Sequence, residues 1–302
     1  MQARTSIRRT VRGIRRRLAT AYARCFFPRT VENLQAYRSE LAEKRGLEIG
    51  GPSGILGVEG PLPVYDVLES LDNCLYSSRT IWTGEVAGKA SFVYDPNKKP
   101  GNQIFCEASH LGPVSDSSYE CVIASHCLEH VANPLKALQE WRRVLAPQGL
   151  LLMVLPHKDG TFDWRRPTTK LEHMVTDYEN NVGEDDLTHL PEILSLHDLK
   201  RDEAAGTPEQ FRERCLDNLS KRAIHHHVFE THTALAVVDR ASFQILQVSA
   251  FRPYHIMILA RRLEGVPDNA AFLGTQAEFR RRSPFRSDRL DLSQSPGTNC
   301  AN

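Results

Sequence analysis

The sequence predicts an α/β protein with a mostly parallel sheet covered by helices, and three observations predict it. A short strand over 47–49 opens into a glycine-rich turn. The middle of the chain then alternates strand, helix and strand, which favours a parallel sheet because parallel neighbours need a crossover between them. Two later apolar stretches, 243–250 and 254–260, are joined by a tight turn and predict an antiparallel hairpin at one edge of that sheet.

Each element follows from its local pattern. The segment 133–145 is expected to be a helix, because its apolar side chains recur at spacings of three and four. The segment 150–155 is a continuous apolar run, as expected for a strand with both faces covered. A helix over 31–44 begins after the capping residue Thr30 and ends at Gly46. The other expected elements are strands at 104–107 and 120–125 and a helix at 231–240.

Composition and charge describe an ordinary globular chain of 302 residues with a net charge of +1. That balance gives no global field toward nucleic acid. No apolar run reaches the ~18–20 residues that span a bilayer, and no secretory signal is expected. Seven cysteines without a C-x-x-C pair argue against a disulfide framework, so a reducing, cytoplasmic setting is expected.

The chain is expected to have three parts. Residues 1–29 form a basic arm, 30–265 form the main domain with a polar insert at 156–224, and the apolar-poor residues 266–302 are expected to be a disordered tail. The arm is strongly basic, since residues 1–30 hold nine arginines and no acid.

Residues 5–25 of this arm predict an amphipathic helix. Its apolar stripe lies at helical spacing and is formed by Ile7, Val11, Ile14, Leu18, Tyr22 and Cys25. Three interpretations stay open: a helix on an anionic membrane surface, an organellar transit peptide, and a solvated arm that docks on its own domain or on a partner.

A block of about 40 residues carries a family resemblance. It runs from Asp116-Ser117-Ser118-Tyr119-Glu120 through Glu129-His130, Asn133-Pro134 and Arg143-Val144-Leu145 to a strand ending at Pro156. This order resembles the class I S-adenosylmethionine-dependent methyltransferases of the ubiquinone/menaquinone-type "methyltransferase 11" group. The resemblance covers roughly 46–261. It implies a Rossmann-like three-layer sandwich with a seven-stranded sheet, S-adenosylmethionine as cofactor, and methyl transfer as the activity.

The resemblance also assigns cofactor-binding residues. In the first motif, the turn glycines would cradle the methionine moiety and Glu48 would orient it; these glycines are Gly50, Gly51 and Gly54. Pro52 stands where the family has its middle glycine, so the turn departs from the pattern there. Glu107 and the backbone of Ala108 would bind the adenine, and Ser125 would lie beside the methionine.

The second motif of the family is an acid at the end of strand two that accepts from both ribose hydroxyls. Asp66, Glu69 and Asp72 all lie at about the expected distance along the chain, and Asp72 is favoured.

Histidines supply the candidate base. If the methyl acceptor is a hydroxyl, a general base is useful, and a histidine suits the task near neutral pH. His157 is the first candidate and His126 the second. The segment His126–His130 also fits the H-x-x-E-H pattern of inverted zinc peptidases, but it follows a strand directly and lacks the helix that this chemistry needs. No metal is therefore assigned.

The polar insert follows strand five, at the sheet edge where substrates bind in such folds. Its first residues suggest a clamp for an anionic or sugar-like acceptor, made by Asp159, Asp163, Arg165 and Arg166. The insert is rich in histidine and aspartate, so it is either a lid with charges facing water, which is favoured, or a metal-binding segment.

The expected function is methylation of a small molecule, with O-methylation of a hydroxylated glycan, glycolipid or metabolite favoured. A small-molecule acceptor is the expected partner and nucleic acid is not. Three alternatives remain: an inactive methyltransferase-like partner subunit, favoured by Pro52 and the unsettled ribose acid; a zinc hydrolase; and a nicotinamide oxidoreductase, disfavoured because the turn lacks G-x-G-x-x-G spacing.

Overall fold

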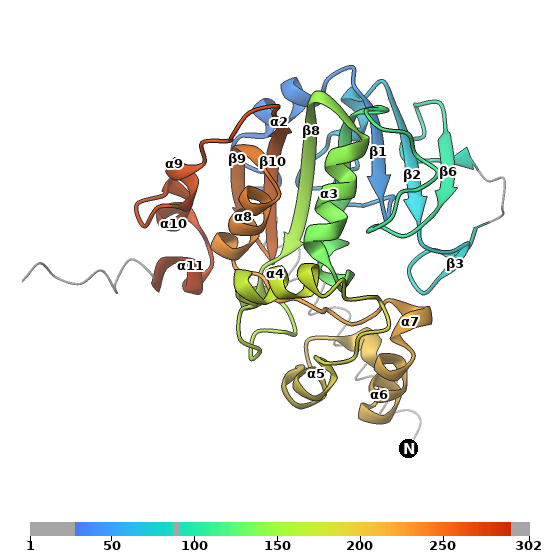
Figure 1. Ribbon diagram of the computed structural model, residues 1–302, viewed down its shortest axis with the longest axis vertical. Coiled ribbons are helices and arrows are strands. Elements are labelled where there is room, and N and C mark those ends of the chain that lie inside the picture. The colour runs from blue at the N-terminus through green and yellow to red at the C-terminus, as the bar shows by residue number, and fades with distance from the viewer. Residues whose placement is uncertain (1–27, 87–90, 291–302) are drawn as a thin grey trace, which may run out of the picture.

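A computed structural model describes residues 28–86 and 91–290, and its centre is one twisted sheet (Figure 1). The strand order is β5-β6-β2-β1-β7-β8-β10-β9. The strands are β1 (Arg45–Ile49), β2 (Ser70–Leu75), β5 (Ser91–Phe92), β6 (Gly101–Phe105), β7 (Tyr119–Ser125), β8 (Leu145–Pro156), β9 (Phe243–Phe251) and β10 (His255–Arg262). A separate short hairpin pairs β3 (Arg79–Thr80) with β4 (Gly84–Glu85).

The predicted topology is confirmed. Strands β6, β2, β1, β7 and β8 are parallel neighbours, whereas β10 runs antiparallel to both β8 and β9. The expected seven strands are therefore present, and the two-residue β5 adds a short antiparallel edge. The strand order reverses between β1 and β7, which places a ligand-binding crevice at the carboxyl ends of these strands.

Helices and loops cover both faces of the sheet. On one face, α3 (Pro134–Val144) and α8 (Thr231–Arg240) pack on the strands, and Trp141 of α3 is completely buried. The predicted start of α3 is confirmed by Asn133, whose side chain accepts a hydrogen bond from the Lys136 amide at 3.1 Å. The other face is covered by α2 (Leu34–Leu41) and the apolar residues of the loop before β2.

The polar insert is a folded helical unit below the carboxyl edge of the sheet (Figure 1). Its helices are α4 (Leu171–Glu179), α5 (Leu190–Leu196), α6 (Pro208–Leu216) and α7 (Asn218–Lys221). A small apolar core holds α5 and α6 together through Ile193, Phe211 and Cys215.

The expectation of a disordered tail from 266 is wrong for its first part. Three short helices follow β10: α9 (Ala270–Leu273), α10 (Glu278–Arg282) and α11 (Arg286–Leu290). They are held by buried Phe279 and Phe285 and by Asp288, whose carboxylate accepts from the Thr231 hydroxyl at 2.7 Å. The expected arm helix at 5–25 and the last residues, 291–302, lie outside the described residues. Among the helices of the described part, none is long and apolar enough to cross a bilayer.

Candidate functional site

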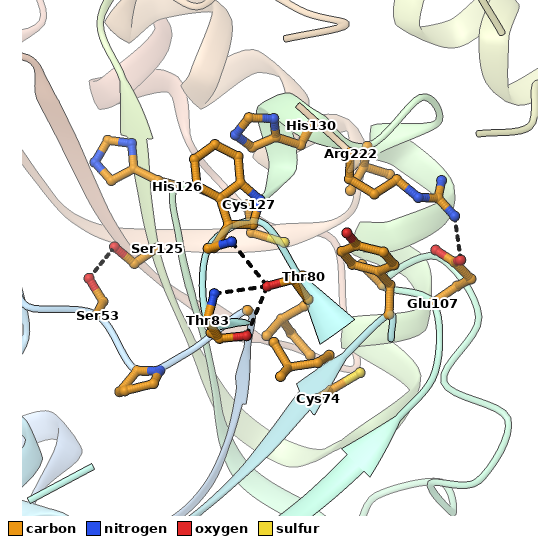
Figure 2. A pocket seen from close by; sticks show the side chains of 18 of the residues that line it. Ser53, Cys74, Thr80, Thr83, Glu107, Ser125, His126, Cys127, His130 and Arg222 are labelled. Atoms are coloured by element: carbon orange, nitrogen blue, oxygen red, sulfur yellow. Dashed lines mark hydrogen bonds and ion pairs between the residues drawn. The ribbon is translucent and has the colours of Figure 1, made fainter. Parts of the chain in front are cut away.

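A pocket of about 580 Å³ opens at the carboxyl edge of β1, β2, β6 and β7 (Figure 2). It is lined by the residues that directly follow each strand, namely Gly50, Tyr76, Cys106 and His126. Side chains from the insert and from the β3–β4 hairpin close its sides. The pocket therefore occupies the crevice that the strand order predicts.

The glycine turn after β1 brings backbone to the pocket wall. Gly50 has φ +84°, a conformation that favours glycine, and it lines the pocket together with Gly54. The Gly51 amide donates to Asn73 Oδ1 at 3.0 Å, which anchors the turn to β2. The Ser53 and Ser125 hydroxyls lie 2.9 Å apart and join the turn to the end of β7. Three of these predicted residues, Gly50, Gly54 and Ser125, thus lie where the sequence places them.

Glu48 does not line the pocket. Its carboxylate lies beneath the turn, fully buried, with Tyr65 Oη at 2.8 and 2.9 Å from its two oxygens. A Cβ on Gly51 would lie only 2.3 Å from Glu48, so the second glycine is required for the carboxyl to fit below the backbone. Burial raises the pKa of Glu48 to about 8. Glu48 and Gly51 therefore support the turn and do not line the pocket.

None of the three candidate ribose acids reaches the pocket. Asp72 lies in the middle of β2 and accepts hydrogen bonds from Tyr119 Oη at 2.8 Å and from the Asn102 amide at 2.6 Å. Asp66 pairs with Arg38, and Glu69 precedes β2. The assignment of Asp72 is wrong because β2 extends to Leu75, so the residues at its carboxyl end are Leu75 and Tyr76.

Glu107 and Ala108 line the pocket as predicted, but Glu107 is paired. Arg222, at the end of α7, lies 2.5 Å from Glu107 Oε1 and 2.9 Å from Glu184 Oε2. Both partners from the insert also line the pocket. Burial raises the pKa of Glu184 to about 7. This ion-pair bridge fastens the insert to the end of β6 (Figure 2).

A histidine pair lies on the opposite wall. His126 Nε2 and His255 Nδ1 are 3.0 Å apart, and both residues line the pocket. His126 Nδ1 lies 3.4 Å from the buried carboxylate of Glu129. Burial, together with the neighbouring His126, lowers the pKa of His255 to about 3. The pKa of Glu129 is lowered too, because the hydrogen bond and charges of the nearby histidines outweigh the effect of its burial.

The zinc-peptidase arrangement does not form. Leu128–His130 is a single 3₁₀ turn, and His126 precedes it with φ +51°. The two histidines of the H-x-x-E-H pattern therefore do not lie one turn apart on a helix, as metal-binding histidines of that class must.

His157 is not a pocket residue, so its assignment as the first candidate base is wrong. Its ring is completely buried and stacks on Phe285, with the ring centroids 4.0 Å apart. Its Nε2 lies 3.2 Å from Asp288 Oδ1. The C-terminal helices, which the sequence suggested were disordered, cover this histidine.

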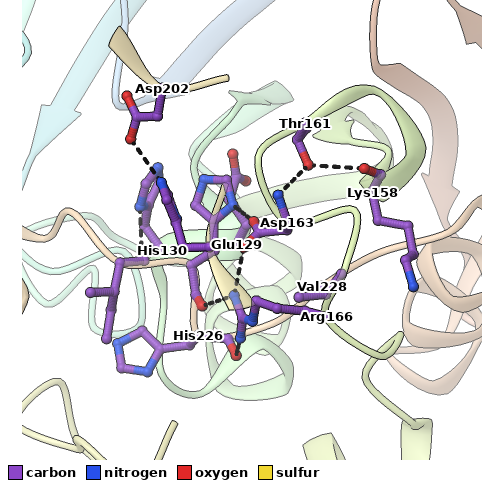
Figure 3. A network of polar contacts seen from close by, with 12 residues as sticks. Glu129, His130, Lys158, Thr161, Asp163, Arg166, Asp202, His226 and Val228 are labelled. Carbon is purple, nitrogen blue, oxygen red and sulfur yellow. Dashed lines mark hydrogen bonds and ion pairs between the residues drawn. The ribbon is translucent and has the colours of Figure 1, made fainter. Parts of the chain in front are cut away.

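The four predicted acceptor-binding residues build the insert and do not line the pocket. Asp163 and Arg166 form a buried ion pair at 3.0 Å, and Asp163 also holds His225 Nδ1 at 2.5 Å (Figure 3). Although burial alone would raise it, the pKa of Asp163 is lowered by its contacts with His225 and Arg166. Arg165 is half exposed beside Trp164, and Asp159 accepts from the Ser287 amide at 2.9 Å.

Several pocket residues escaped sequence reasoning. Thr80, Trp82 and Thr83 come from the β3–β4 hairpin, in a region with turn signals but little periodicity. His255 is the first residue of β10, and Tyr254 directly precedes it. The position of these two residues could have been predicted from the expected hairpin. A strand that runs antiparallel to β8 must begin at the carboxyl edge of the sheet, so its first residues lie at the ligand crevice.

The pocket fits S-adenosylmethionine in size and backbone geometry. Its volume lies within the range of small-molecule sites. Gly50 lets a ligand approach the main chain, and a Cβ on Gly54 would meet no atom within 4 Å, so the turn leaves open space there. Two hydroxyls also belong to the pocket wall: Thr80 Oγ1 and Thr83 Oγ1 lie 2.8 Å apart.

A comparison with protein families shows the kind of domain. A family model described as "Methyltransferase domain" matches residues 12–204. A solved S-adenosylmethionine-dependent methyltransferase from Methanosarcina mazei is 16% identical, with 78% of this chain and 99% of that chain covered and a TM-score of 0.44. One from Mesorhizobium loti is 15% identical, with 76% and 95% covered and a TM-score of 0.43.

A curated relative adds only a local match. An uncharacterized 37.1 kDa protein in transposon Tn4556 of Streptomyces fradiae is 45% identical over 56 residues. The match spans 18% of this chain and 16% of that protein.

Proposed function

We propose that this chain, which belongs to the methyltransferase-domain family and uses S-adenosylmethionine as its cofactor, methylates a hydroxyl group of a small-molecule acceptor. The observation that supports a hydroxyl as the methyl acceptor is the pair of His126 and His255 in the pocket wall, with Glu129 next to His126. Transfer to a hydroxyl releases a proton, and this pair can take it.

When bound, the cofactor supplies an electrophilic methyl group on a sulfonium. The pocket residues would hold the donor against the glycine turn, with Gly50, Gly54, Ala108 and Ser125 around it. With donor and acceptor bound, the insert and the β3–β4 hairpin would keep water away from them, which favours an in-line displacement between aligned partners.

The proton path follows from the hydrogen-bond partners. The ionised carboxylate of Glu129 can only accept a hydrogen bond from His126 Nδ1, so we assign the proton of the neutral His126 ring to Nδ1. His126 Nε2 then accepts from His255 Nδ1, which leaves His255 Nε2 as the basic nitrogen of the pair. The acceptor proton passes to His255 Nε2 while the proton on His255 Nδ1 passes to His126 Nε2. The resulting imidazolium of His126 is stabilised by the Glu129 carboxylate.

Aromatic side chains at the pocket suit a ring-shaped acceptor. Trp82 is 59% exposed and its ring lies 5.3 Å from that of His130, while Tyr254 packs edge-on to His126. Aromatic faces of this kind contact the apolar face of a sugar or an aromatic metabolite. A hydroxylated glycan, glycolipid or metabolite is therefore the acceptor class that we propose.

The test is acceptor-dependent formation of S-adenosylhomocysteine with a panel of hydroxylated, amino and carbon acceptors, followed by mass spectrometry of the products. We expect turnover with hydroxylated compounds and an O-methyl product. His255→Asn and Glu129→Gln should lower kcat by about 10²-fold or more, the typical contribution of a general base, with cofactor affinity kept. His232→Ala, in α8 outside the pocket, is the matched control. Products methylated only on nitrogen or carbon, or an unchanged kcat in His255→Asn, would refute the proposal.

A further inference from the structure

A second cluster of histidines lies where the insert meets the segment that follows it, away from the pocket wall. It consists of His173, Asp177, His189 and His227, each of which offers one ligand atom, and these atoms all lie within 4.8 Å of one another. None of the four lines the pocket at the carboxyl edge. The proposed methyl transfer does not use them.

Three distances between ligand atoms of this cluster are close to the edge length of a metal-centred tetrahedron. Tetrahedral zinc with ligands at 2.0–2.1 Å requires ligand atoms about 3.3 Å apart. His173 Nε2 lies 3.1 Å from His189 Nε2 and 3.5 Å from Asp177 Oδ2. His227 Nε2 lies 3.7 Å from the same Asp177 Oδ2. Three imidazoles and one carboxylate are also a donor set that suits zinc.

Without a metal ion, these four side chains lack a full set of hydrogen-bond partners. Asp177 is 8% exposed, and its Oδ2 atom is buried with no hydrogen-bond partner among the described residues. His227 Nε2 has the Ala132 carbonyl oxygen at 3.2 Å, but a proton donated there does not serve Asp177. The facing nitrogens of His173 and His189 can share only one proton between neutral rings. A single divalent cation would satisfy all four groups at once.

We propose that His173, Asp177, His189 and His227 bind one zinc ion that fastens the insert to the methyltransferase domain. Four protein ligands leave no open coordination position, which is the mark of a structural zinc site. His173 and Asp177 come from α4, His189 precedes α5, and His227 lies in the segment that leads to α8.

The proposed zinc site is connected to the pocket wall through neighbouring residues. Next to His227, the His226 amide donates to the Glu129 carbonyl at 2.8 Å, and the Ile224 carbonyl oxygen lies 3.0 Å from His130 Nδ1. Glu184, which lines the pocket, lies between α4 and His189. Loss of zinc would therefore loosen this side of the pocket without removing any residue from it.

A neighbouring group, Glu129 with His130 and His225, is the competing position for an ion. Protein partners already hold its members: His126 lies 3.4 Å from Glu129, and Asp163 holds His225 Nδ1. Figure 3 shows Glu129 and His130 beside the polar contacts that Asp163 and Arg166 make in the insert.

The experiment is elemental analysis of the purified full chain after incubation with Zn²⁺ and removal of the free ion. We expect one zinc per chain in the wild type. His189→Ala and the near-isosteric Asp177→Asn should bind little zinc, while His232→Ala and His130→Ala should still bind one zinc per chain. Cobalt loaded in place of zinc should give the visible absorption of a tetrahedral ion, a readout that needs no variant.

Stability gives a second readout. A chelator should lower the Tm of the wild type and leave that of His189→Ala unchanged. The proposal fails if the wild type holds no stoichiometric zinc and shows no tetrahedral cobalt spectrum. It also fails if zinc is retained by folded His189→Ala, or if His130→Ala loses zinc, since the ion would then lie at the Glu129 group.

Discussion

Replacing Glu48 by glutamine should remove a pH dependence from the stability of the protein. Burial raises the pKa of this carboxyl from 4.5 to about 8 in the folded state. Between these two values the folded protein holds a proton that the unfolded chain has released. The unfolded state then binds fewer protons, so the free energy of unfolding falls as the pH rises. The contribution of Glu48 is fully present below pH 4.5 and is lost as the pH passes through about 8.

The magnitude follows from the same two values. Their difference corresponds to about 5 kcal/mol, at roughly 1.4 kcal/mol for each tenfold change in proton affinity. Glutamine stays neutral at every pH and can still hydrogen-bond to Tyr65, whose Oη lies 2.8 and 2.9 Å from the Glu48 oxygens. Relative to Glu48→Gln, the wild type should therefore lose about 4 to 5 kcal/mol between pH 4.5 and 9.

Urea unfolding of both proteins at a series of pH values measures this difference. Other titrating groups, such as His130 with its pKa lowered by burial to about 4, titrate equally in both proteins, so their contributions cancel. Glu69→Gln, at an exposed carboxyl, is the matched control and should show no pH-dependent difference. A difference between wild type and Glu48→Gln that is flat across the range, or that grows in favour of the wild type, would refute the buried position of this carboxyl.

Three further predictions concern single residues. Gly50→Asp should weaken cofactor binding at least about 100-fold, some 3 kcal/mol, because a charged side chain would enter the pocket; calorimetry is the assay and Gly265→Asp the control. Trp82→Ala should raise the KM for the acceptor about tenfold at unchanged Tm, since the side chain is mostly exposed; an unaltered KM would place the acceptor elsewhere. Arg166→Met should cost about 3 to 5 kcal/mol in urea unfolding, because it leaves the buried Asp163 without its arginine; a loss below ~1 kcal/mol would contradict that pairing.

The central part of the fold could be predicted because its elements bury continuous apolar patterns. The helix expected at 133–145 is found at Pro134–Val144, and the strand expected at 150–155 lies within Leu145–Pro156. The glycine turn and the end of β7 were placed correctly for the same reason, whereas β6 ends at Phe105, two residues before the expected end.

The remaining parts depend on contacts that leave no local pattern. Asp72 was favoured by distance along the chain, but the last residue of β2 decides which side chain faces the pocket, and that residue is Leu75. The C-terminal helices are fixed by a few side chains such as Phe285, too sparse to raise the local apolar content. The insert is held by buried ion pairs, among them Asp163 with Arg166, which resemble a solvated surface in sequence.

The central claim is that the pocket between the glycine turn and Glu107 binds the cofactor, and calorimetric titration with S-adenosylmethionine and S-adenosylhomocysteine tests it most directly. The account predicts micromolar binding of one molecule per wild-type chain and none to folded Gly50→Asp. Equal affinity in the wild type and in Gly50→Asp would contradict the position of the site. Absence of binding to the folded wild type would contradict its use of the cofactor.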